Sequence, residues 1–165
     1  AKSQFSLSNT DSQWQIGATA IGQGNTVISP IHAAMLVSAI ANGGTLMKPY
    51  VIDSVQSTEG SVIEQYESEN YGTLMSASES SQLTKMMKAV VEEGTGYKLS
   101  GKNYSVAGKT GTAEVVGRGN NAWFVGFAPA DDPKIAICVL VEDAGTASSE
   151  AVPIAGEILD AYLNN

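Results

Sequence analysis

The sequence predicts an α+β fold in which an antiparallel sheet, made of three C-terminal strands plus a hairpin, packs with helices. In three segments the apolar residues either recur every three or four residues or occupy nearly every side of a helix, and both patterns predict helices. Short strand-like runs, separated by turns rich in Gly, Pro, Ser and Asp, supply the sheet. The 165 residues show no internal repeat or low-complexity linker, and their 43% hydrophobic content suffices for one domain, or a large part of one.

The first elements are a strand and a helix. Residues Gln15 to Ile21 are expected to form a short strand that ends at Gly22-Gln23-Gly24. A helix then starts at Ser29-Pro30, because serine is a good N-cap and proline suits the first helical position. It stops at Asn42-Gly43-Gly44, a common C-terminal signal. This helix is apolar on nearly all sides, which indicates that it lies inside a larger body.

The middle of the chain predicts a hairpin and a second helix. Val51 to Val55 and Val62 to Tyr66 flank the turn Ser57-Thr58-Glu59-Gly60. Ser76 and Glu79 have the spacing of a capping box, and apolar residues follow at helical intervals until Gly94-Thr95-Gly96 breaks the pattern.

Three strands and a final helix complete the chain. The strands are expected at Tyr104 to Ala113, Ala122 to Ala128 and Lys134 to Val141, and the helix at about Ser149 to Leu163. The last strand is apolar without alternation, so both of its faces must be covered. We expect the final helix on one face, with the helix near Met35 and material outside this chain covering the rest.

Charge and composition exclude several classes of protein. The formal net charge of −8 argues against nucleic-acid binding, which needs clustered Lys and Arg. No run of eighteen apolar residues occurs, so no segment of this sequence is expected to span a membrane. The single cysteine, Cys138, can form no intrachain disulfide and is interpreted as a small buried hydrophobic residue.

The most informative segment is Lys109-Thr110-Gly111-Thr112. It sets a cation, two hydroxyls and a glycine on a short extended stretch, which suits a site that holds a carboxylate and lets a substrate backbone lie alongside. Because Thr110 and Thr112 are two apart on a strand, their hydroxyls should line one side. The alternative, an ordinary solvated Lys109, stays open on these residues alone, since most lysines are exposed.

Five segments in order resemble the C-terminal half of the transpeptidase domain of class B penicillin-binding proteins. They cover nearly the whole chain, and their order and spacing carry the resemblance more than Lys-Thr-Gly alone. The segments are Gly22-Gln23-Gly24, Ile28-Ser29-Pro30 with the helix to Gly44, Gly94-Thr95-Gly96, Gly108 to Glu114, and Ala122 to Pro129. The resemblance implies part of the fold shared by penicillin-binding proteins and serine β-lactamases, and acyl transfer without a metal or organic cofactor.

The resemblance also implies roles for single residues. Lys109 would stabilise the ionised base network and attract the substrate's terminal carboxylate, and the hydroxyls of Thr110 and Thr112 would bind that carboxylate. The backbone N–H of Thr112 would contribute to the oxyanion hole, and Gly111 would let the peptide pair edge to edge with the strand. Lys109 and Thr112 are therefore the predicted catalytic residues. The loop Gly22-Gln23-Gly24 is expected to be structural and close to the site.

The family's nucleophile is a serine of a Ser-x-x-Lys motif, and here no serine stands three residues before a lysine. Thr45 and Thr95 have that spacing to Lys48 and Lys98, but both lie in glycine-flanked turns. We therefore expect residues 1–165 to be the C-terminal part of the domain, with the Ser-x-x-Lys and Ser-x-Asn motifs upstream of it. The intact parent would be a serine-type D,D-transpeptidase, and this chain alone would be inactive.

Two other interpretations remain: a non-catalytic penicillin-sensing or interaction domain of the same fold, and, less favoured, a serine β-lactamase. The expected partners are peptidoglycan stem peptides, β-lactams and the N-terminal half of the same domain, with possible self-association through the strand Ile135 to Val141. The parent is expected at the extracytoplasmic face of the bacterial cell membrane, anchored by an upstream segment.

Overall fold

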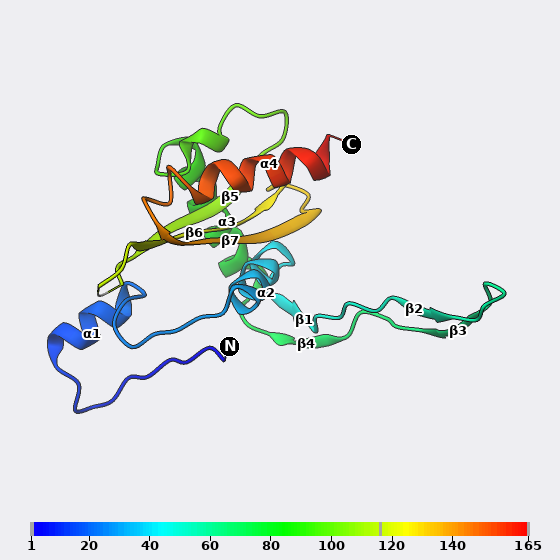
Figure 1. Ribbon diagram of the computed structural model, residues 1–165, viewed down its shortest axis with the longest axis horizontal. Helices are drawn as coiled ribbons and strands as arrows, with labels where there is room; N and C mark the ends of the chain where they lie inside the picture. The colour runs from blue at the N-terminus through cyan, green and yellow to red at the C-terminus, as the bar shows by residue number, and fades with distance from the viewer. Residues whose placement is uncertain (1, 116, 165) are drawn as a thin grey trace.

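A three-stranded antiparallel sheet between two helical layers forms the body of the protein (Figure 1). The computed structural model describes residues 2–115 and 117–164. The sheet has the order β5 (Ala107–Ala113), β6 (Asn120–Ala128), β7 (Ile135–Ala144). The α4 helix (Ala151–Leu163) covers one face, and α2 (Pro30–Ala41) and α3 (Ala77–Glu92) lie on the other. The predicted α+β class is confirmed.

The two faces of the sheet form two apolar clusters, because successive side chains of a strand point to opposite sides. On the α4 side, Phe124 packs with Leu159 and Val152, and all three are fully buried. On the other side, Phe127 packs with Val37 of α2 and Met87 of α3. Since β7 contacts both α2 and α4, both faces of the last strand are covered, as its continuous apolar run predicted.

Two glycines make room for the Phe124 ring within the sheet. A Cβ at Gly108 would lie 2.4 Å from Phe124 Cζ, and one at Gly126 would lie 2.6 Å from the Ala107 carbonyl oxygen. No real Cβ atom makes contacts this close, so position 108 accepts only glycine while residue 124 is phenylalanine, and position 126 requires glycine because of the Ala107 backbone as well as the Phe124 ring.

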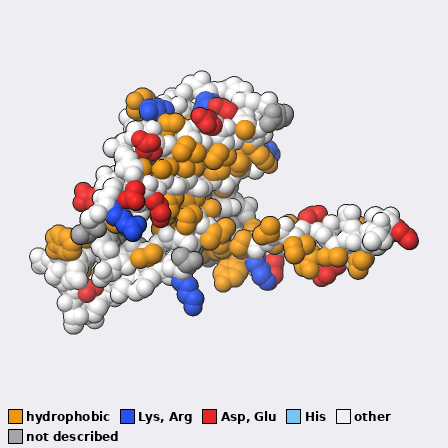
Figure 2. All heavy atoms as spheres, viewed as in Figure 1, with side chains coloured by type: hydrophobic (Ala, Val, Ile, Leu, Met, Phe, Trp, Pro, Cys, Tyr) orange, Lys and Arg blue, Asp and Glu red, His pale blue; other side chains and the backbone are white. Residues whose placement is uncertain are grey.

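The predicted hairpin belongs to an arm that extends from the body (Figure 1). Near the body, β1 (Thr45–Met47) pairs with β4 (Asn70–Thr73); further out, β2 (Ser54–Gln56) pairs with β3 (Val62–Gln65). The hairpin is confirmed, but its strands form sheets separate from the three-stranded one. Figure 2 shows apolar side chains along the arm, where Val51 is 100% exposed and Ile63 is 69% exposed.

The strand expected at Gln15 to Ile21 is wrong: this segment is the helix α1 (Gln13–Ala20). The physical reason is a capping box, in which the Ser12 hydroxyl accepts from the Gln15 N–H while the Gln15 side chain accepts from the Ser12 N–H. None of the residues in α1 is buried, so its apolar residues, such as Trp14, lie on the surface.

The other elements keep their predicted identity with adjusted ends. The capping box of Ser76 and Glu79 starts α3, as predicted. The first sheet strand begins at Ala107, after the short 3₁₀ turn η1 (Tyr97–Leu99), and the last one continues to Ala144.

The last helix is fixed to the body by Asp160. Its carboxylate accepts from Lys102 Nζ at 2.5 Å and from the Tyr104 hydroxyl at 2.6 Å. These two partners hold the pKa of Asp160 below its ordinary value. Burial, followed by the bond to Asp160, raises the pKa of Tyr104.

Among residues 2–115 and 117–164, no helix has both the length and the apolar character needed to cross a bilayer. Within the same residues, no group of His, Cys, Asp and Glu side chains is arranged to hold a metal ion.

Candidate functional site

The segment Lys109 to Thr112 lies on β5, an edge strand of the sheet. Lys109 pairs with Val125 and Gly111 with Trp123, on the face covered by α2 and α3. Thr110 pairs with Phe124, so Thr110 and Thr112 share the α4 face. The prediction that the two hydroxyls line one side is confirmed. The Lys109 side chain lies on the opposite face of the sheet. Its ammonium group can approach the two hydroxyls only by passing around the open edge of β5.

The open edge of β5 carries backbone groups of Thr110 and Thr112. Lys109 Nζ donates a hydrogen bond to the carbonyl of the next residue, Thr110. The Gln23 side-chain amide donates to the Thr112 carbonyl at 3.5 Å. Both carbonyls therefore point away from β6. Since the N–H and C=O of a residue in an antiparallel strand point the same way, the Thr112 N–H also faces the open edge.

The two threonine hydroxyls differ in exposure and in bonding. Thr112 is exposed, and its Oγ1 accepts from the Ala147 N–H at 3.2 Å, which leaves the hydroxyl hydrogen available for another acceptor. Thr110 is 7% exposed, and its Oγ1 lies 2.5 Å from the Oγ1 of Thr95. Thr95 follows α3 in the Gly94-Thr95-Gly96 turn and is the site neighbour that the sequence did not identify.

A hollow of about 490 Å³ lies between α2 and α3 beside Lys109. Lys109 is the one charged side chain among its described lining residues, so the ammonium group stands at the border of an apolar space. The other lining residues are Ile28, Ala33, Leu36, Val37, Ile40, Leu83, Met86, Met87, Val90 and Val125. Such a surface is suited to further apolar side chains.

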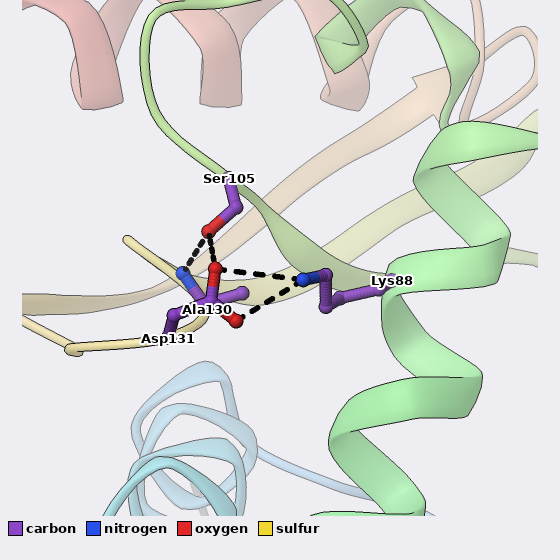
Figure 3. Close-up of polar contacts among 4 residues, drawn as sticks. All are labelled: Lys88, Ser105, Ala130 and Asp131. Carbon is purple, nitrogen blue, oxygen red and sulfur yellow. Dashed lines mark hydrogen bonds and ion pairs between the residues drawn. The ribbon is translucent and has the colours of Figure 1, made fainter.

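A second polar cluster lies near the start of β5 and joins Lys88, Ser105 and Asp131 (Figure 3). Ser105 Oγ donates to Asp131 Oδ2 at 2.8 Å and accepts from the Ala130 N–H at 2.9 Å, while Lys88 Nζ lies 3.1 Å from Asp131 Oδ1. The Ser105 bond first, and then Lys88, hold the pKa of Asp131 below its ordinary value. The lowered pKa makes the Asp131 carboxylate too weak a base to activate the Ser105 hydroxyl, so we interpret this cluster as a structural link between the β6–β7 turn and α3.

One tripeptide, Ser68-Glu69-Asn70, has the Ser-x-Asn spacing that the resemblance placed upstream. It lies where the arm enters β4, which pairs with β1. Glu69 forms an ion pair with Lys48 at 2.8 Å, and β4 packs on β1 instead of β5. This tripeptide therefore takes no part in the site around Lys109.

The loop Gly22-Gln23-Gly24 reaches the site, as expected. Gly22 and Gly24 have φ angles of 80° and 71°, which favour glycine, and the turn they form directs Gln23 to the Thr112 carbonyl. This loop thus contacts the strand edge through the Gln23 amide.

Comparison with known proteins matches residues 2–160 to the penicillin binding protein transpeptidase domain family. Similar curated proteins include the peptidoglycan D,D-transpeptidase PbpA of Mycolicibacterium smegmatis, 34% identical over 90% of this chain and 32% of the relative. Another is Stage V sporulation protein D of Bacillus subtilis, 38% identical over 86% of this chain and 23% of the relative. The class B resemblance is confirmed by these relatives.

Among solved structures, penicillin-binding protein A of M. tuberculosis in an imipenem acyl-enzyme complex superposes with a TM-score of 0.88. It is 31% identical, and the match covers 99% of this chain and 37% of that one. The chain thus spans about a third or less of the proteins it resembles. The match along nearly its whole length shows that this chain belongs to the penicillin-binding protein transpeptidase domain family.

Proposed function

We propose that the intact protein is a peptidoglycan D,D-transpeptidase and that this chain supplies the strand that binds the substrate. The observation that carries the proposal is the open edge of β5, where Lys109, the Thr112 hydroxyl and the outward backbone of Thr112 meet. The named relatives include peptidoglycan D,D-transpeptidases, which supports the assignment.

The carboxylate of a D-Ala-D-Ala terminus fits this edge. The hydroxyls of Thr110 and Thr112 lie on one face, and Lys109 Nζ reaches the edge from the other, so an anion there meets donors from both sides. Charge-assisted hydrogen bonds of this kind are about twice as strong as neutral ones. A Cβ at Gly111 would meet only Trp123 Cβ, at 3.5 Å, so the strand surface beside Gly111 is open to a peptide backbone.

The Thr112 N–H is one donor of the proposed oxyanion hole. During acyl transfer the substrate carbonyl becomes a tetrahedral oxyanion, and a fixed N–H aimed at that oxygen lowers the barrier; loss of one such donor costs about 10²–10³ in rate. A serine oxygen forms the ester bond while the C–N bond to the terminal D-alanine breaks. The amine of a neighbouring stem peptide then takes the acyl group and releases the serine.

The nucleophile and its base are proposed to lie in the N-terminal part of the same domain. This part would pack into the apolar hollow between α2 and α3, which brings its serine to the Lys109 side of β5. β-Lactams would acylate the same serine. In a solved structure of a related protein, imipenem forms an acyl-enzyme complex. We place the intact protein at the extracytoplasmic face of the membrane, where its substrate is.

A non-catalytic penicillin sensor of the same fold is the second candidate. It would keep the carboxylate-binding strand and react with penicillin, but it would not process a peptide. Acylation by penicillin therefore does not separate the two candidates, whereas release of D-alanine does.

The test compares the intact protein with the isolated chain of residues 1–165. We expect fluorescent penicillin to label the intact protein covalently and not the isolated chain, because the chain provides donors without a nucleophile. We also expect the intact protein to release D-alanine from a peptide that ends in D-Ala-D-Ala. Labelling without D-alanine release would favour the sensor, and stoichiometric labelling of residues 1–165 would contradict the proposed division of the site.

A further inference from the structure

The turn Gly94-Thr95-Gly96 is built so that its middle residue reaches β5. Gly94 and Gly96 both lie against the last turn of α3: a Cβ at Gly94 would stand 2.9 Å from the Val90 carbonyl oxygen, and one at Gly96 would stand 3.2 Å from it. The Gly96 N–H also donates to that oxygen at 2.9 Å. A side chain at either flank would push the turn away from α3. Glycine at both positions thus fixes where Thr95 lies.

Thr95 is held from a second direction by the turn between β7 and α4. Ser148 Oγ donates to the Thr95 carbonyl at 2.7 Å, and the neighbouring Ala147 N–H donates to Thr112 Oγ1 at 3.2 Å. One turn therefore contacts both Thr95 and Thr112. Thr95 Oγ1 in turn lies 2.5 Å from Thr110 Oγ1. Each strand hydroxyl therefore has one hydrogen-bonded neighbour: Thr95 for Thr110, and the Ala147 N–H for Thr112.

The donation of the Thr112 hydroxyl follows from its contact with Ala147, and that of the Thr110 hydroxyl depends on the direction of its bond to Thr95. Thr112 Oγ1 is occupied as an acceptor, so its hydrogen is directed elsewhere. If Thr95 donates to Thr110 Oγ1, the Thr110 hydrogen is also free, and the chain of hydroxyls is polarised toward an anion at the strand edge. If Thr110 donated to Thr95 Oγ1 instead, the Thr110 hydrogen would be engaged there, and the anion would have one donor fewer.

We propose that Thr95 is a positioning residue for the transpeptidase site: it donates to Thr110 Oγ1 and thereby orients the Thr110 hydroxyl toward the substrate carboxylate. This inference rests on the proposed function. It assigns to the Gly-Thr-Gly turn a role in binding the carboxylate, although the side chain of Thr95 is bonded to Thr110 and its carbonyl to Ser148 in the turn after β7.

The test uses the intact protein and two ligands, penicillin G and its methyl ester, which lacks the negative charge. Thr95→Val removes the hydroxyl at constant shape and Thr95→Ser keeps it. We expect Thr95→Val to slow acylation by penicillin G about 10-fold, in line with one hydrogen bond to a charged group, and to change the rate with the ester less than about twofold. Thr95→Ser should restore the rate with penicillin G. The ratio of the two rates does not depend on the folded fraction of a preparation.

Thr84→Val is the matched control, because the Thr84 hydroxyl donates to the Ser80 carbonyl within α3, at 2.9 Å, and lies away from the open edge of β5. It should leave both rates unchanged. In a Thr110→Val background, Thr95→Val should have little further effect with penicillin G. Equal slowing with acid and ester, or additive effects of the two substitutions, would overturn the inference while leaving the proposed function intact. Failure of the unsubstituted protein to react with penicillin G would overturn both.

Discussion

Lys109 extends from the border of the apolar hollow to the open edge of β5, where its ammonium group meets the Thr110 carbonyl. The side chain is exposed and has no carboxylate partner among the described residues. Its charge is therefore available to a ligand, and its removal should leave the core unchanged.

Lys109→Ala in the intact protein is expected to slow acylation by penicillin about 10²-fold or more, because it removes the charge that we propose stabilises both the bound carboxylate and the transition state. The melting temperature should change little. Stopped-flow measurement of the acylation rate checks this. Lys134→Ala is the control, since Lys134 forms a surface ion pair with Asp132 at 2.8 Å. An unaltered rate in Lys109→Ala would mean that another cation has this role.

At the residue scale, the sequence predicted the groups on β5 but not those that orient them. Lys109, Thr110 and Thr112 are neighbours in the chain, so a local motif brings them together. Thr95 meets Thr110 only because α3 and β5 pack side by side, and Ala147 reaches Thr112 across 35 residues. The one local feature of the sequence that pointed to Thr95 was the pair of glycines, Gly94 and Gly96, on either side of it.

The helices illustrate what local signals predict at the scale of elements. Both capping boxes are in the sequence, but only the one at Ser76 precedes a long amphipathic run; the one at Ser12 starts a helix of 8 residues without a buried face. A strand was therefore predicted for α1 in error. The arm was predicted in part, because its inner strands depend on pairing between β1 and β4, which are far apart in the chain.

The cap of α3 provides a test at this scale, since α3 supports both β5 and the turn that carries Thr95. Ser76→Ala should lower the free energy of unfolding by about 1 kcal/mol, because the Glu79 N–H loses its side-chain acceptor. Ser78→Ala, at an exposed position of the same first turn, should have little effect. Chemical denaturation of the intact protein compares the two. Equal effects would show that the cap does not contribute.

The attachment of α4 by Asp160 predicts a pH dependence. The folded-state pKa of Asp160 is lowered from 3.8, so its contribution to stability is complete above the unfolded-state pKa and is lost as pH falls through the folded-state value. Asp160→Asn should therefore lower the melting temperature at neutral pH, and the difference should shrink between about pH 5 and pH 2. Glu64→Gln on the exposed arm is the control. A difference that stays constant with pH would show that charge has no part in this attachment.

For the whole molecule, the open surfaces matter most. In the described residues β7 pairs only with β6, so its outer edge presents free N–H and C=O groups over a mostly apolar strand. Such an edge pairs readily with another strand. The net charge of −8 opposes contact between copies, and salt screens this repulsion.

The isolated chain of residues 1–165 is therefore expected to self-associate through β7, and more strongly as salt is raised. Light scattering coupled to size exclusion measures this over micromolar concentrations. Leu140→Lys on β7 should reduce association, whereas Val62→Lys on β3 of the arm should not. A monomer with a cooperative melt at all salt concentrations would show that this part of the domain closes its own core.

The fit of Phe124 between Gly108 and Gly126 has a consequence for how this family can vary under selection by antibiotics. A larger residue at 108, next to Lys109, requires residue 124 to shrink first, although residue 124 lies in the core on the face away from the Lys109 side chain. Position 111 has no such constraint, since a Cβ there makes an ordinary contact of 3.5 Å. In aligned sequences, glycine at 108 should accompany a large aromatic residue at 124, whereas glycine at 111 should be retained for the peptide backbone proposed to lie beside it and not for packing.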